Sequence, residues 1–191
     1  MEAVASRRLP SPLLLVGIAL AGAAVSLGIG LYASEHDPTG QSILGDGLFF
    51  TATLNMKAWF ATAAGVLALF QLYSALRFYD KISFPREMPS WLVNGHHVSG
   101  TLAFLLTLPV AYHCVWALGY SVDGPDNRVV AHGLLGCFFY GAFTAKMLFL
   151  RVKELPGLIL PIVGGLTFTA LIGIWLTSGL WFFENFGFPS F

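Results

Sequence analysis

The sequence predicts an all-α protein whose five helices cross a lipid bilayer. Of its 191 residues, 56% are hydrophobic and only 10% are charged, against roughly 25% charged residues in a soluble domain. The mean hydropathy is +0.73, and five stretches approach or exceed the roughly 20 apolar residues that a spanning helix needs. We therefore expect one transmembrane domain over residues 1–191, with helices at about 13–33, 48–77, 96–120, 126–150 and 156–183.

Each predicted helix contains an uncharged run. The first run covers residues 13–32 and follows Arg7 and Arg8, as the apolar region of a signal peptide would. It is longer than the roughly 7–15 apolar residues of such a peptide, so we expect a retained helix. The second run covers residues 58–76 and extends upstream across Lys57. The remaining runs cover residues 98–122, 129–145 and 155–183.

Basic residues are unevenly distributed between the two ends of these helices. If five helices alternate in direction, one end receives Arg7, Arg8, Arg77, Lys81, Arg86, Arg151 and Lys153. The loops at the other end contain only Arg128, with Lys57 just inside a helix. The positive-inside rule then places the N-terminus in the cytoplasm and the C-terminus outside. We expect a multi-pass protein of the bacterial plasma membrane, and its zero net charge argues against a nucleic-acid partner.

Small residues and cysteines within these runs suggest how the helices pack. Ala24 and Gly28 are four residues apart in the first helix, a spacing that allows close helix approach. Cys114 and Cys137 lie inside apolar helices, where a free cysteine usually behaves as a small hydrophobic residue. A disulfide between them would require their two helix faces to meet.

Two histidines are predicted at membrane depth. His113 lies within the uncharged run at 98–122, and His132 lies near the start of the next helix. Ionisable residues inside the membrane are costly and suggest a functional role. Counting 1.5 Å per residue puts both within roughly 10–15 Å of the outer ends of adjacent helices. Two imidazoles at matched depth could ligate the iron of one haem b from opposite faces.

Four neighbouring residues are consistent with a haem. Arg128 is one helical turn before His132, and Lys57 lies at the outer end of the second helix, so each could bind a propionate. Gly133 and Gly136 leave space beside His132 for a flat ring. Other interpretations stay open, namely two histidines hydrogen-bonded between helices, a copper site, or a proton relay.

A second haem is less favoured. His113 follows His97 by 16 residues, which rotates the two side chains about 160° apart on a helix. The fourth helix has Lys146 and Met147 at its inner end and no second histidine there. A second haem would therefore need His97 and Met147 as its ligands. We expect one haem.

The histidine segments resemble a known group of proteins. The stretch His96-His-Val-Ser-Gly-Thr-Leu-Ala-Phe, then Tyr112-His113-Cys114 and Ala131-His132-Gly133, is similar to small bacterial b-type cytochromes of the cytochrome b561 and ferric-reductase-like group. This resemblance covers the helices at 96–120 and 126–150 and implies that His113 and His132 are axial ligands. The whole chain also resembles an uncharacterised family of bacterial five-helix membrane proteins.

These observations lead to one functional expectation and one alternative. We expect a membrane b-type cytochrome that transfers electrons near the extracytoplasmic face, with lipid, membrane quinol and an outside redox protein as partners. The alternative is a non-redox accessory or assembly subunit of a respiratory complex. A small transporter is disfavoured, because no helix is visibly broken in mid-span and no carboxylate lies at mid-depth.

Overall fold

The computed structural model describes residues 9–42, 50–120 and 126–188, and its principal elements are five long helices. These are α1 (Pro12–Glu35), α2 (Thr53–Phe78), α3 (Leu92–Tyr112), α4 (Asn127–Phe149) and α5 (Ile159–Trp175). The helix α3 continues into the π-helical turn η1 (His113–Ala117), and α5 continues through η2 (Leu176–Leu180) into α6 (Trp181–Phe186). The five resulting segments are long and apolar enough to cross a membrane, which confirms the predicted all-α, five-span architecture.

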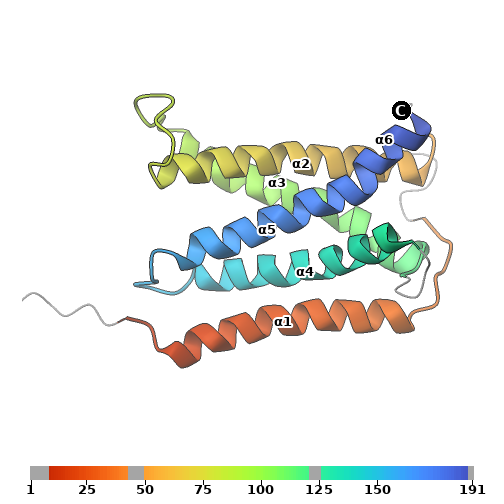
Figure 1. The fold of residues 1–191 in the computed structure, drawn as a ribbon, viewed down its shortest axis with the longest axis horizontal. Coiled ribbons are helices and arrows are strands. Elements are labelled where there is room, and N and C mark those ends of the chain that lie inside the picture. Colours follow the sequence, from red (N-terminus) through yellow and green to blue (C-terminus); the bar gives the residue numbers. More distant parts are fainter. Residues whose placement is uncertain (1–8, 43–49, 121–125, 189–191) are drawn as a thin grey trace, which may run out of the picture.

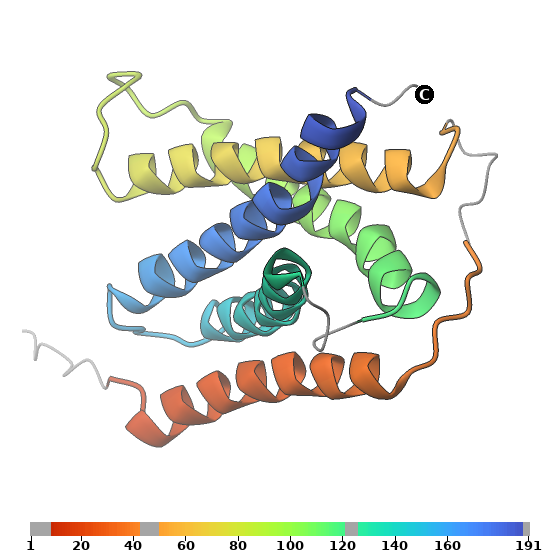
Figure 2. The ribbon, with the colours of Figure 1, turned by 45° about the vertical axis from the view of Figure 1, so that its right-hand side comes forward.

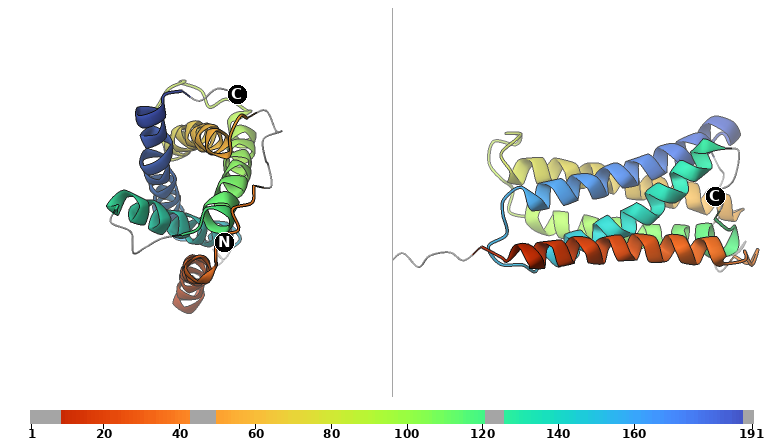
Figure 3. Two further views of the ribbon diagram at one scale, coloured as in Figure 1. Left: turned by 90° about the vertical axis from the view of Figure 1, so that its right-hand side faces the viewer. Right: turned by 60° about the horizontal axis from the view of Figure 1, so that its bottom comes forward.

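The helices alternate in direction along one long axis, so that the start of α1 and the end of α6 lie at opposite ends of the bundle (Figure 1). Seen end-on, α2, α3, α4 and α5 form a ring, and α1 lies outside it beside α4 (Figure 3). The pairs α1–α4, α2–α3 and α4–α5 pack along most of their length. The contact between α3 and α4 is made by side chains, with Phe104 stacked on Phe143 at 4.2 Å between ring centroids and the Tyr140 hydroxyl donating to Thr107. The two helices diverge in the turned view (Figure 2).

Local sequence signals set several helix ends. The Ser11 hydroxyl accepts a hydrogen bond from the Leu14 amide at 3.2 Å, and Pro12 occupies the first turn of α1. At the start of α4, the Asp126 carboxylate caps the Arg128 amide at 2.8 Å. The third helix begins at Leu92 rather than at the predicted 96, so its first turn already includes Gly95.

A polar cluster joins α2 to α3 in the half of the bundle away from α6. Gln71 Nε2 donates to the backbone carbonyl of His96 and, at 2.8 Å, to Ser99 Oγ. The ring of His96 also hydrogen-bonds Ser74 Oγ at 2.6 Å through Nδ1. This partner set gives His96 a structural role in fixing the α2–α3 contact.

Glycine allows the close approach of α1 to α4. A Cβ on Gly22 would lie 2.7 Å from the Gly141 carbonyl oxygen, and a Cβ on Gly141 would collide with Ser26. Ala24 and Gly28, whose spacing also allows close approach, do not make this contact, because Ala24 is exposed and a Cβ on Gly28 would meet no atom within 4 Å. Gly22 and Ser26 are four residues apart, as are Ala24 and Gly28, so the spacing alone does not show which face of α1 contacts α4.

Candidate ligand pocket

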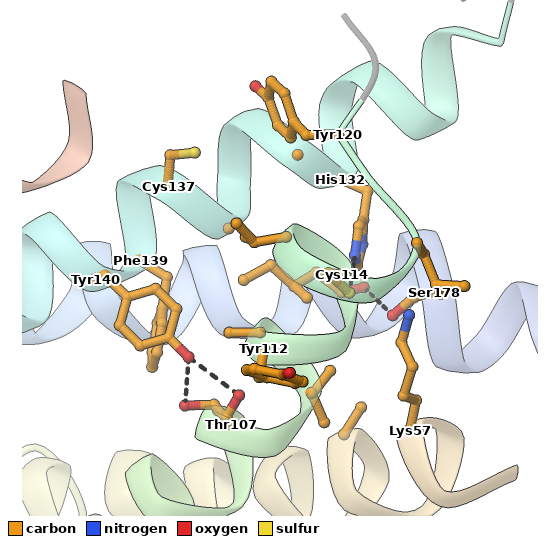
Figure 4. A pocket seen from close by; sticks show the side chains of 18 of the residues that line it. Lys57, Thr107, Tyr112, Cys114, Tyr120, His132, Cys137, Phe139, Tyr140 and Ser178 are labelled. Atoms are coloured by element: carbon orange, nitrogen blue, oxygen red, sulfur yellow. Dashed lines mark hydrogen bonds between the residues drawn. The ribbon is translucent and has the colours of Figure 1, made fainter. Parts of the chain in front are cut away.

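A cavity of about 740 Å³ lies between α3 and α4 at the end of the bundle that holds α6. Residues from all five spans line it, and most of them are apolar or aromatic. Polar side chains gather in one part of the cavity, where His132 and Lys57 reach in from α4 and α2 beside Cys114 and Ser178 (Figure 4). An apolar cavity with a few convergent polar groups is the usual form of a small-molecule site.

The cavity brings together five of the six residues that the sequence analysis assigns to a site. These are Lys57, Arg128, His132, Gly133 and Gly136. They come from two helices that are far apart in the sequence, α2 and α4. The sixth residue, His113, is not part of the cavity wall.

Both ring nitrogens of His132 have a neighbouring polar atom. The Thr177 hydroxyl lies 2.8 Å from the Gly173 carbonyl and 3.1 Å from the Ile174 carbonyl, to either of which it can donate its one proton. When it does so, its oxygen accepts from His132 Nδ1 at 3.2 Å. In that tautomer Nε2 is unprotonated and faces Cys114 Sγ at 4.0 Å. This arrangement, with a partner holding the second ring nitrogen, is typical of histidines that ligate metals.

His113 is fully buried, and both of its ring nitrogens have hydrogen-bond partners that do not line the cavity. Its Nδ1–H donates to the Pro109 carbonyl at 2.7 Å, and its Nε2 accepts from the Ser42 hydroxyl at 2.9 Å. The expectation that His113 and His132 face each other across a haem is therefore not met by this arrangement. His113 instead anchors the loop that follows α1.

That loop, residues 36–42, lies across η1, and we call it the strap. Pro109 lacks an N–H, and a few residues later the helix widens into a π turn closed by the Leu118 amide on the His113 carbonyl. The strap amides of Thr39 and Gly40 donate to the carbonyls of Trp116 and Ala117, both at 3.0 Å. The strap thus supplies partners to the end of α3 and holds the π turn in place.

Arg128 is held by three groups. Its guanidinium donates to the Thr177 carbonyl at 2.8 Å and to Asp126 at 3.1 Å, and it lies 3.9 Å from the centre of the Trp181 ring. A guanidinium has five N–H donors, so these bonds leave donors that can serve a ligand. Arg128 combines an anchoring role between α4 and α6 with a position on the cavity wall.

The two glycines beside His132 differ in surroundings. The ring of Tyr120 packs directly on Gly133, where any Cβ would collide with it. Burial, and then the neighbouring Cys137, raise the pKa of the Tyr120 hydroxyl, which therefore stays protonated at neutral pH. A Cβ on Gly136 would meet no atom within 4 Å, so this glycine leaves open space in the cavity wall.

Cys114 is a site residue that the sequence analysis missed. Its sulfur lies 4.0 Å from His132 Nε2, and the Lys57 ammonium is within hydrogen-bonding reach of it. The run Tyr112-His113-Cys114 drew attention to the histidine, but neighbouring helical residues point about 100° apart, so only one of the two can face α4. Cys114 and Cys137 are both free thiols. His97 and Met147, considered for a second haem, both lie exposed on the bundle surface.

Comparison with protein-family models assigns the chain to a family. The model of a family of unknown function, DUF6529, matches residues 14–190, which is nearly the whole chain. The chain belongs to this family. No curated protein and no solved structure matches it. Membership agrees with the expected resemblance to an uncharacterised membrane family, whereas the resemblance to b-type cytochromes rests only on the residues quoted for it.

Proposed function

We propose that the protein is a membrane b-type cytochrome that binds one haem b in this cavity, with His132 as an iron ligand. The observation that carries the proposal is the position of His132 on the cavity wall with Thr177 Oγ1 3.2 Å from its Nδ1. With the ring proton on Nδ1, the Nε2 lone pair would be available to a metal inside an apolar cavity. Haem iron needs only axial ligands from the protein, because the porphyrin supplies the other four nitrogens.

The remaining cavity residues fit the shape and charge of a haem. Lys57 and the unused donors of Arg128 are cationic groups that could bind propionates. Gly136 leaves room for a flat ring beside His132, and the many apolar side chains suit the macrocycle. When bound, the haem would supply a one-electron carrier, and the protein residues would orient it and exclude water.

The position of the cavity suggests the direction of electron transfer. It lies at the end of the bundle opposite Arg77 and Arg151, which mark the cytoplasmic end by the positive-inside rule. We infer that the haem lies near the outer face of the plasma membrane. Membrane quinol is then a chemically suitable donor and a redox protein outside the membrane a suitable acceptor.

The proposal is tested by measuring the haem content of protein purified in detergent after expression with ample haem. We expect one haem per chain in the wild type and a large loss of haem in His132→Ala. His97→Ala is the matched control, since it removes an exposed imidazole and should leave the haem content unchanged. A colourless wild type, or haem retained in full by His132→Ala, would overturn the proposal.

A non-redox accessory subunit is the alternative function, and the hydrogen bonds of His113 favour it. The presence of this histidine at membrane depth is explained by its hydrogen bonds to Pro109 and Ser42, without a cofactor. On this alternative the cavity would hold a lipid chain, and wild-type protein would contain phospholipid in place of haem in native mass spectrometry.

A further inference from the structure

The side chain that faces His132 across the cavity is Cys114. It comes from η1, whereas His132 comes from α4, so the two lie on opposite walls of the space between α3 and α4. Their ligating atoms, Sγ and Nε2, are 4.0 Å apart. His113, one residue earlier, is directed to Ser42.

This separation suits a single metal centre held by both atoms. A first-row metal binds thiolate at about 2.3 Å and imidazole at about 2.0–2.1 Å. Ligands on opposite sides of such a metal are then about 4.3–4.4 Å apart, and ligands at a tetrahedral angle are about 3.6 Å apart. The observed 4.0 Å lies between these limits, so a shift of a few tenths of an ångström allows either geometry.

Ligation needs an unprotonated imidazole nitrogen and a thiolate. Thr177 Oγ1, 3.2 Å from His132 Nδ1, can accept the ring proton there, which leaves the lone pair on Nε2. Cys114 must lose its thiol proton, since the thiolate is the metal-binding form. The Lys57 ammonium lies within hydrogen-bonding reach of that sulfur and compensates the negative charge in an apolar surrounding. Ligation breaks the S–H bond, forms a metal–sulfur bond, and releases the proton to water without any change of oxidation state.

This position offers too few ligating side chains for a bare metal ion, but enough for haem iron. Among the described residues, there is no group of three or more histidine, cysteine or acidic side chains that could surround an ion. A haem needs only the two axial ligands, and the cavity of about 740 Å³ next to Cys114 and His132 offers room for the macrocycle.

We propose that Cys114 and His132 are the two axial ligands of the metal centre, as a thiolate–imidazole pair in place of the two histidines expected from the sequence. This inference rests on the proposed function, in that a haem occupies the cavity. A thiolate is a stronger electron donor than an imidazole and favours ferric iron, so the centre has a lower midpoint potential than a bis-histidine haem.

The test uses absorption and electron paramagnetic resonance spectra of purified full-length protein with haem. The wild type should give the low-spin ferric signature of thiolate–imidazole ligation. Cys114→Ser should lose that signature while retaining haem on His132. Cys137→Ser is the matched control, because it removes the other cavity cysteine. It should keep the wild-type spectrum.

A wild-type measurement makes the test independent of variants that fold poorly. Resonance Raman spectra of protein labelled with ³⁴S-cysteine should contain an iron–sulfur band that shifts with the isotope, and the band should persist in Cys137→Ser. Absence of an isotope-sensitive band, or an unchanged spectrum in Cys114→Ser, would overturn the thiolate ligand and leave the haem proposal standing. A wild type without haem would overturn both.

Discussion

Replacing Thr177 by valine tests the tautomer argument directly. Valine keeps the branched shape of threonine and removes only the hydroxyl, which accepts the Nδ1 proton of His132 at 3.2 Å. Hydrogen bonds between membrane helices average about 0.6 kcal/mol, so the stability of the protein should change little. Loss of a partner that orients a metal-ligating histidine costs about 10–100-fold in metal affinity, which corresponds to about 1.4–2.7 kcal/mol.

The assay is a haem titration of apo protein in detergent, with thermal unfolding measured on the same samples. Thr167→Val is the matched control, because Thr167 also donates to a carbonyl one turn earlier, that of Val163 at 2.8 Å, but lies outside the cavity wall. We expect a 10–100-fold weaker haem affinity for Thr177→Val and no change for the control. Equal affinity in Thr177→Val and the wild type would refute the assigned tautomer.

The other predictions concern packing, charge and topology. Gly141→Val should lower the unfolding temperature in detergent, by an overpacking cost of about 1–3 kcal/mol, whereas Gly164→Ala, which meets no atom within 4 Å, should not. Arg128→Ala should shift the haem midpoint potential in the negative direction, because a nearby cation stabilises the more negative reduced form. An unchanged midpoint potential would show that Arg128 acts only through its contacts with α6. A reporter fused after Phe191 should be active outside the cell, and one inserted near Lys81 inside; the opposite pattern would refute the orientation.

The sequence was sufficient to predict the five spans because uncharged runs of this length have few alternatives in a folded protein. The predicted helix limits differ from the observed ones by a few residues where no strong cap exists, as at the start of α3. The convergence of Lys57 with Arg128 and His132 was also predictable, since α2 and α4 run in the same direction and all three residues lie near the start of their helices.

The contact of His132 with Cys114 was not predictable from counting along a regular helix. Periodicity gives the depth of His113 but not the direction of its side chain relative to α4, which depends on how α3 packs on α2. The π turn beginning at His113 and the Ser42 hydroxyl also depend on a loop that comes from elsewhere in the chain. Pro109, four residues earlier, is the signal that should direct attention to an irregular helix at this point.

Because all five spans contribute to the wall of the cavity, the cavity cannot exist on a partly synthesised chain. Trp181 and Phe182, near the C-terminus, line the same space as Gly28 and Ile29 in the first span. A ligand therefore has no complete binding site until the last helix has left the ribosome and inserted in the bilayer. If a haem binds here, its loading would be a late step in the biogenesis of this protein, and a chain truncated before α6 would lack the part of the wall formed by Trp181 and Phe182.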